Sequence, residues 1–349
     1  MIRSWMTQVD FFNSLLLPLP TPPLPEPSIP LGVGRRPGQC SRRNKLSATP
    51  QATKRSPDDY HATIRALNSK GRRPTKSLGQ HYMLNSEINE RLAAAADVGE
   101  GDVVLEIGPG TGSLTHVLIG NGATVLAVEK DRHMAAIVTE RFANTSRLKV
   151  VQEDFVKCRI ASLIHELTQS TPSGNGEMRL AKVAANVPFN ITKDIIRYLL
   201  PMGDIFSEVA LLLQEETALR IAKASPCTSE YRPINVFVNF YSEPNYEFHV
   251  PRSNFFPQPN VDAAVVTFKL KKAAEYPDVM STKSFFSMVN SAFRGRRKML
   301  RKSLQHISTA LEIEEALDNV GLPVTSRPEE LTVDDFVNFY NKLVVQPMS

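Results

Sequence analysis

A short segment, Asn186-Val-Pro-Phe189, is the part of this chain best suited to hold the amine of a planar base. The lone pair of such an amine is delocalised into the ring, which makes it a poor nucleophile. Two acceptors for its hydrogens, the Asn186 side-chain oxygen and the Val187 carbonyl, would localise that lone pair. Pro188 stiffens the turn, and Phe189 offers a face on which an unstacked base can stack. We therefore expect these four residues to form a catalytic turn.

A glycine-rich turn upstream predicts where a nucleotide-like cofactor binds. Asp102-Val-Val-Leu-Glu-Ile107 is typical of a buried parallel strand, and Gly108, Gly110 and Gly112 follow it. A helix is expected over 113–119. Glycines at such a turn let a cofactor press on the backbone. The spacing Gly-x-Gly-x-Gly, rather than Gly-x-Gly-x-x-Gly, favours S-adenosylmethionine, and a dinucleotide is the remote alternative.

Two carboxylates follow the next two predicted strands. Glu129 ends the strand expected over 123–128, where it could accept both hydroxyls of a ribose. Asp154 follows the strand expected over 148–152, where it could accept from an adenine amine. Asp154 could instead cap the following helix, which is a common use of aspartate. Their order along the chain favours the cofactor role for both.

These elements predict an α/β fold with a Rossmann-like, doubly wound sheet. A further strand over 180–185 would place Asn186 at the same edge of the sheet. Strand patterns stop near residue 270, and four helices are expected after it, over 284–290, 294–306, 311–320 and 332–343. Thr332 with Asp335 resembles a capping box. We expect a cofactor-binding domain over 58–270 and a helical, RNA-binding domain over 271–349.

Residues 1–57 differ in composition from the rest. They hold 10 of the 25 prolines, and eight Lys and Arg residues against two Asp and Glu residues. Such a segment cannot bury enough apolar surface to fold alone, so a disordered leader resembling an organelle transit peptide is expected. Frequent Ser and Pro without an Arg-rich amphipathic helix favour the chloroplast stroma over the mitochondrion. The plainer alternative is an extension that carries no address.

The remaining chain is nearly neutral, with 33 Lys and Arg residues against 34 Asp and Glu residues, so nucleic-acid affinity would need a local patch. One stretch has six basic residues and no acid: Arg294, Arg296, Arg297, Lys298, Arg301 and Lys302. Charge runs are often solvated helix faces, but this one favours RNA phosphates. Lys70, Arg72, Arg73 and Lys76 form a looser cluster.

Composition argues against several other classes of protein. No apolar run approaches the roughly 18 residues that a membrane-spanning helix needs. The three cysteines, Cys40, Cys158 and Cys227, fit no metal-ligand spacing. We therefore expect no membrane and no metal, and a reducing compartment.

Seven stretches together resemble the dimethyladenosine transferases of small-subunit ribosomal RNA, the rRNA adenine N6-dimethyltransferase family. They are Lys76-Ser-Leu-Gly-Gln-His-Tyr82, Glu106-Ile-Gly-Pro-Gly110, Asn186-Val-Pro-Phe-Asn190, Gln214-Glu-Glu216 with Arg220, Phe255-Phe-Pro-Gln-Pro-Asn-Val-Asp262, Phe293-Arg-Gly-Arg-Arg-Lys298 and Arg327-Pro-Glu329. The resemblance runs from about residue 70 to the C-terminus.

The resemblance implies a methyltransferase that dimethylates two adjacent adenosines in the 3′-terminal hairpin loop of that RNA, using S-adenosylmethionine. Its partner would be small-subunit rRNA in a partly assembled ribosomal subunit, and we expect a monomer. The cofactor contacts that it implies are His81, Met83, Gly108, Gly110, Glu129, Asp154 and Asn186. Members often have Asn at His81 and Tyr at Phe189, so a side-chain contact from His81 is less secure than a backbone one.

Two alternatives stay open. A non-catalytic RNA- or DNA-binding factor for assembly or organelle transcription could use the same fold. Glu129, Asp154 and Asn186 together favour an enzyme, because a binding protein need not keep all three. A relative that methylates large-subunit RNA is disfavoured by the basic C-terminal segment and the leader.

Overall fold

The computed structural model describes residues 80–170, 179–295 and 297–345. The expected leader (1–57), the basic cluster over 70–76 and Arg296 lie outside the described residues. All statements about the fold and the site concern the described part of the chain.

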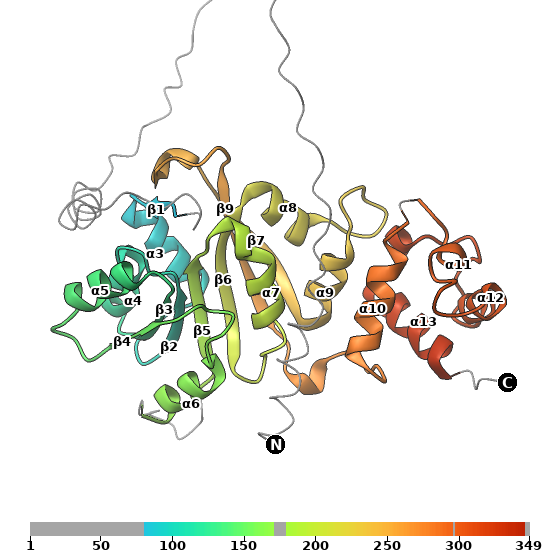
Figure 1. The fold of residues 1–349 in the computed structure, drawn as a ribbon, viewed down its shortest axis with the longest axis horizontal. Helices are drawn as coiled ribbons and strands as arrows, with labels where there is room; N and C mark the ends of the chain where they lie inside the picture. Colours follow the sequence, from blue (N-terminus) through green and yellow to red (C-terminus); the bar gives the residue numbers. More distant parts are fainter. Residues whose placement is uncertain (1–79, 171–178, 296, 346–349) are drawn as a thin grey trace, which may run out of the picture. The chain divides into compact units, whose positions relative to one another are not determined.

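A seven-stranded sheet positions the site (Figure 1). Its order is β4 (Leu148–Gln152), β3 (Thr124–Glu129), β2 (Val103–Ile107), β5 (Ala181–Asn186), β6 (Phe206–Gln214), β9 (Ala263–Leu270) and β7 (Ser242–Val250). The first five strands are parallel, and β9 is antiparallel to β6 and β7. Chain order reverses between β2 and β5, the point where such sheets bind ligands. The expected doubly wound α/β sheet is confirmed, as are the ends of its first four strands.

Seven helices connect or flank these strands: α3 (Ser86–Ala95), α4 (Ser113–Gly120), α5 (Arg132–Arg141), α6 (Ile160–Ser170), α7 (Thr192–Leu199), α8 (Glu215–Lys223) and α9 (Pro233–Tyr241). The core between them contains Leu92 of α3, Leu118 of α4, Val125 of β3 and Leu212 of β6. A separate ladder pairs β1 (Tyr82–Met83) with β8 (Phe255–Phe256). It brings the segment before α3 to the same edge of the sheet.

Four helices follow β9: α10 (Thr282–Ala292), α11 (Leu300–Ser303), α12 (Ala310–Asn319) and α13 (Val333–Val345). Three expected helices are confirmed. The capping box is also confirmed, because Thr332 Oγ1 accepts from Asp335 N at 3.1 Å and Thr332 N donates to Asp335 Oδ2 at 2.9 Å.

The helix expected over 294–306 is wrong, since only Leu300–Ser303 is helical there. Arg297 has a φ of 62°, which a right-handed helix does not allow. The Leu300 N–H donates to the carbonyl of Ser326 at 2.9 Å, whereas a helix over 294–306 would require it to donate to the carbonyl four residues earlier. Tertiary packing thus overrides the good helix propensity of Arg and Lys.

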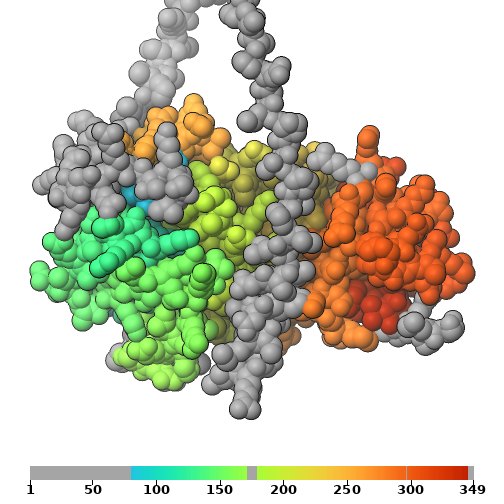
Figure 2. All heavy atoms as spheres, viewed as in Figure 1, coloured from blue at the N-terminus to red at the C-terminus, as the bar shows by residue number. Residues whose placement is uncertain are grey.

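Aromatic rings join the C-terminal helices to α9. Phe240 lies 5.4 Å from Phe285 and 5.2 Å from Phe286, and Phe237 lies 5.1 Å from Phe286, between ring centroids. In Figure 2 the side chains of these helices, orange to red, form one continuous surface. The strand-containing and helical parts therefore share an aromatic core, and the domain boundary near residue 270 stays a prediction.

Candidate active site

One cavity at the carboxyl ends of the parallel strands brings the predicted site residues together. Its lining includes every residue expected to bind the cofactor or to form the catalytic turn: His81, Met83, Gly108, Gly110, Glu129, Asp154, Asn186, Val187, Pro188 and Phe189. These residues come from segments up to about 100 positions apart. The sheet order β4-β3-β2-β5 lines up their strand ends, with Asp154 at one side and Asn186 at the other.

The glycine turn after β2 has the backbone that only glycine adopts easily. Gly108, Gly110 and Gly112 have φ values of 67°, 57° and 82°. A Cβ on Gly112 would lie 2.7 Å from the Phe142 ring, so this glycine serves the packing against α5. A Cβ on Gly108 would find no atom nearer than Pro188 Cδ at 4.0 Å, so the space above Gly108 is open to a ligand.

Glu129 is buried at the end of β3. Its Oε1 accepts from the backbone N–H of Asp131 at 2.8 Å, which fixes the carboxylate at the start of α5. Desolvation raises the pKa of Glu129, and backbone N–H groups of Asp131, Gly110 and Lys130 offset part of that rise. A ribose hydroxyl would donate a hydrogen bond to this carboxylate in place of the water that burial has removed.

Asp154 follows β4 and caps a turn that precedes α6 rather than the helix itself. Its Oδ1 accepts from Val156 N at 3.2 Å, which caps the turn after the strand. Its Oδ2 lies 2.8 Å from Lys130 Nζ, and this hydrogen bond is the main reason why the pKa of Asp154 is lowered. The carboxylate is thus held ionised in the cavity wall, ready to accept from an amine.

Asn186 is oriented by the N-terminal segment. Its Nδ2 donates to the His81 carbonyl at 3.4 Å, which leaves Oδ1 on the opposite side of the amide. The His81 ring is itself bound through Nδ1 to the Pro257 carbonyl at 2.6 Å, and it stacks on Phe189 at 6.1 Å between centroids. Phe189 is half-buried and also contacts the core, so one face of it packs while the cavity reaches the rest.

Glu106 is a site residue that sequence analysis did not assign. It lies in the middle of buried β2, is 1% exposed, and lines the cavity beside Gly108. Thr115 donates its hydroxyl to Glu106 Oε2 at 2.6 Å, and desolvation raises the pKa of Glu106 to about 8. The sequence signal that could have identified Glu106 is an acidic residue inside an apolar strand. Burying a carboxylate is costly unless a cation pairs with it, so such a residue indicates a functional role.

The described basic residues of the C-terminal loop separate into two groups. Arg294, Arg297 and Lys298 are exposed. Arg301 is instead half-buried and forms an ion pair with Glu314 of α12 at 2.7 Å. The basic stretch therefore pairs with an acidic residue, Glu314, in the folded chain. Because this ion pair partly neutralises Arg301, its side chain attracts RNA phosphates less than its exposed neighbours do.

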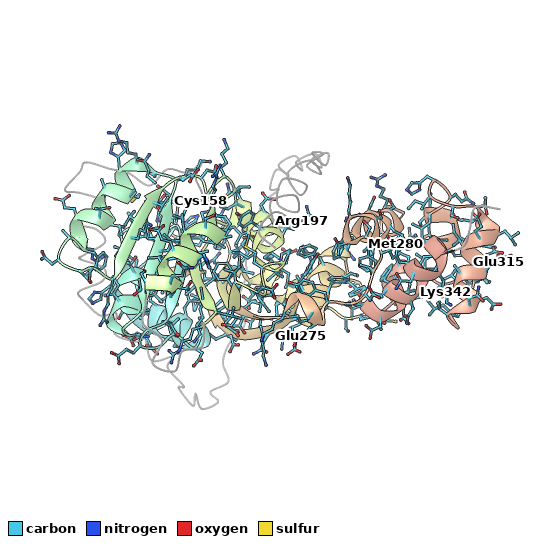
Figure 3. The ribbon with its side chains drawn as sticks, turned by 90° about the horizontal axis from the view of Figure 1, so that it is seen from below. Cys158, Arg197, Glu275, Met280, Glu315 and Lys342 are labelled. Atoms are coloured by element: carbon cyan, nitrogen blue, oxygen red, sulfur yellow. The ribbon has the colours of Figure 1, made fainter. Side chains whose placement is uncertain are left out.

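Three further features of the described residues bear on function. Among the described residues, Glu215, His249 and Asp262 could gather round a metal ion, but Nδ1 of His249 lies 2.8 Å from Glu215 and its Nε2 faces Asp262 at 3.8 Å. Cys158, labelled in Figure 3, is buried, and desolvation raises its pKa to about 12, so it stays a thiol. None of the described helices combines the length and apolar character needed to cross a bilayer.

Comparison with known proteins agrees with this site. The family model of the ribosomal RNA adenine dimethylases matches residues 71–344. The chain belongs to this family. It is therefore a methyltransferase, and S-adenosylmethionine is its methyl donor. The expected family and enzyme class are confirmed.

Individual relatives support the same assignment. The chain is 63% identical to the chloroplastic ribosomal RNA small subunit methyltransferase of Arabidopsis thaliana, over 88% of this chain and 90% of the relative. It is 36% identical to ribosomal RNA small subunit methyltransferase A of Protochlamydia amoebophila, over 79% and 94%.

Among solved structures, a dimethyladenosine transferase from Plasmodium falciparum matches with a TM-score of 0.60, at 21% identity, over 74% of this chain and 95% of that one. The 23S rRNA methyltransferase ErmE matches with a TM-score of 0.55, at 20% identity, over 75% and 99%. At these identities the likeness concerns the fold of the dimethylase.

Proposed function

We propose that this dimethylase methylates the exocyclic amines of two adjacent adenosines in the 3′-terminal hairpin loop of small-subunit rRNA. The observation that carries the proposal is the meeting of Asn186-Val-Pro-Phe189 with the glycine turn, Glu129 and Asp154 in one cavity. Small-subunit rRNA as substrate is supported by the names of the Arabidopsis and Protochlamydia relatives. A partly assembled subunit is the proposed form of that substrate.

In this proposal the residues of the cavity divide the work. Asp154 accepts a hydrogen bond from the adenine of the cofactor, and Glu129 accepts hydrogen bonds from its ribose. The rest of the cofactor lies against His81, Met83, Gly108 and Gly110. The bound cofactor supplies the methyl group. Asn186 Oδ1 and the Val187 carbonyl accept hydrogen bonds from the target amine, and Phe189 stacks on its base. The methylated amine then loses its proton to solvent, so no general base is needed.

We further propose that Arg294, Arg297 and Lys298, which are exposed between α10 and α11, contact RNA phosphates. Arg296, which lies outside the described residues, belongs to the same proposal. Replacing both Arg294 and Lys298 by glutamine should weaken RNA binding and reduce its salt slope by about two, because each lost phosphate contact removes about one released counterion. Filter binding over a range of salt concentrations measures the slope. The double variant of Lys272 and Lys342, both exposed, is the matched control. An unchanged slope in the loop variant would remove this loop from the RNA interface.

The leader and the relatives support a proposed location. The composition of residues 1–57 and the chloroplastic name of the Arabidopsis relative support a plastid enzyme, and we propose the stroma as its compartment. The domain organisation proposed is a leader over 1–57, a methyltransferase domain over 58–270 and an RNA-binding helical domain over 271–349. We propose a monomer that works without a metal.

Methyl transfer to undermethylated small ribosomal subunits tests the proposed function. The protein is incubated with labelled S-adenosylmethionine and either small subunits or free rRNA, and the modified nucleotides are mapped. We expect dimethyladenosine at the two adjacent hairpin positions, formed on subunits. Tight subunit binding without label would instead indicate a binding factor on the same fold, and label on large-subunit RNA would overturn the substrate.

A further inference from the structure

Asn89 is a buried polar residue that the folded chain leaves unsatisfied. It lies on α3 about one turn before Leu92, on the face that packs into the core. Only 1% of it is exposed, and its Nδ2 has no hydrogen-bond partner among the described residues. Buried amides are almost always hydrogen-bonded, so such an exception calls for a reason.

Another buried asparagine shows what a structural role looks like in this chain. Asn235 of α9 is 0% exposed, and its Nδ2 donates to the Arg220 carbonyl at 2.7 Å. Its Oδ1 accepts from Arg232 N at 3.0 Å. In the part of the chain that the structure describes, Asn89 Nδ2 has no such acceptor, so a role in holding the fold together does not explain this N–H donor.

The position of Asn89 points to a ligand. Asn89 is among the residues that line the cofactor cavity, together with Met83, Glu106 and Gly108. With adenine at Asp154 and ribose at Glu129, the sheet order β4-β3-β2-β5 directs the rest of the cofactor past β2. The amino-acid tail of the cofactor then reaches the region that α3 and the segment before it enclose.

We propose that the Asn89 side chain is a cofactor-binding residue that donates to the α-carboxylate of the methionine moiety. This inference rests on the proposed placement of the cofactor. The two buried groups match the two charges of the tail, because the Glu106 carboxyl suits the ammonium and the Asn89 amide N–H suits the carboxylate. Asn89 Nδ2 has no acceptor among the described residues, and the bound carboxylate would provide one.

Calorimetric titration of two ligands tests the contact. S-adenosylhomocysteine has the amino-acid tail, and 5′-methylthioadenosine keeps only the nucleoside part. We expect Asn89→Leu to weaken S-adenosylhomocysteine binding by about 10- to 100-fold, as for a lost hydrogen bond to a charged group, and to leave methylthioadenosine binding unchanged. Asn89→Asp, which keeps the size but repels a carboxylate, should show the same selectivity. Equal losses for both ligands, or no loss, would overturn the proposal.

Thermal unfolding without ligand gives an independent readout. Asn89→Leu should unfold at the same temperature as the wild type or higher, because it removes an unpaired buried donor. Asn235→Leu should unfold at a lower temperature while keeping its affinity for both ligands. If Asn89→Leu were destabilised as much as Asn235→Leu, the amide would have a structural partner and the inference would fail. A wild type that binds neither ligand would instead count against the proposed cofactor site.

Discussion

Asn186→Ala is expected to lower kcat for methyl transfer by about 100- to 1,000-fold, the usual cost of losing one preorganised polar group at a reacting centre. The amide is held by the His81 carbonyl, so its oxygen keeps one direction before the substrate arrives. Alanine removes the acceptor that localises the amine lone pair, and the cavity around it changes little. Single-turnover transfer of labelled methyl groups to small subunits measures the step directly.

Two companion variants make this result specific. Asn190 is exposed and lines the same cavity, so Asn190→Ala should change kcat by less than about threefold, as for most positions without a named interaction. Asn186→Asp keeps an acceptor but loses the donor to His81, so its rate should lie between those of wild type and Asn186→Ala. A wild-type rate in Asn186→Ala would show that the amine is activated by other groups.

Glu106→Gln should remove the pH dependence of cofactor binding. Desolvation raises the pKa of Glu106 to about 8, so at pH 7 the empty site holds mainly the neutral acid. A ligand with an ammonium group favours the carboxylate and displaces the proton. Affinity for S-adenosylhomocysteine should therefore rise with pH, by up to about tenfold per unit, and level off above pH 8. In Glu106→Gln it should be low and flat, and calorimetry at pH 6.5 and 8.5 distinguishes the two.

The same carboxyl predicts how the stability of the unliganded protein varies with pH. A raised folded-state pKa means that the folded protein keeps a proton that the unfolded chain releases. The contribution of Glu106 is then present below about pH 4.5 and is lost as pH rises towards 8. Glu106→Gln should abolish this part of the decline, as seen in thermal unfolding at pH 5.5 and 8.

Methylthioadenosine, which has no ammonium, is the control ligand for the binding prediction. It should bind the wild type and Glu106→Gln with equal affinity. A pH-dependent difference between the two proteins would contradict the proposed pairing of Glu106 with the ammonium.

Sequence reasoning succeeded where the determinants are local. Short apolar runs precede Gly108, Glu129, Asp154 and Asn186 and predict strands. The glycines of the turn predict its backbone conformation. Because parallel strands place their carboxyl ends at one edge of a sheet, four local predictions became one predicted site. Fold and cofactor could be predicted in this way, and the family from the resemblance of seven sequence stretches.

Sequence reasoning failed where a residue depends on a partner far along the chain. Arg294–Met299 has helical propensity, yet Leu300 binds the Ser326 carbonyl and the segment forms a loop. Arg301 meets Glu314 only because α11 packs beside α12. Gly295 is a local signal against a helix, but no local pattern shows that Leu300 pairs with Ser326 or that Arg301 pairs with Glu314.

By itself the sequence determined the four strands that precede the site residues, the glycine turn and the order of the groups that line the cavity, since each follows from short-range backbone preference and burial. Tertiary structure alone decided how those groups are held. The His81 ring binds Pro257 across 176 positions, and its carbonyl orients Asn186 across 105 positions. It also left Asn89 Nδ2 buried with no hydrogen-bond partner in the described ranges, because only the packing of α3 against the cavity shows which polar atoms stay unpaired.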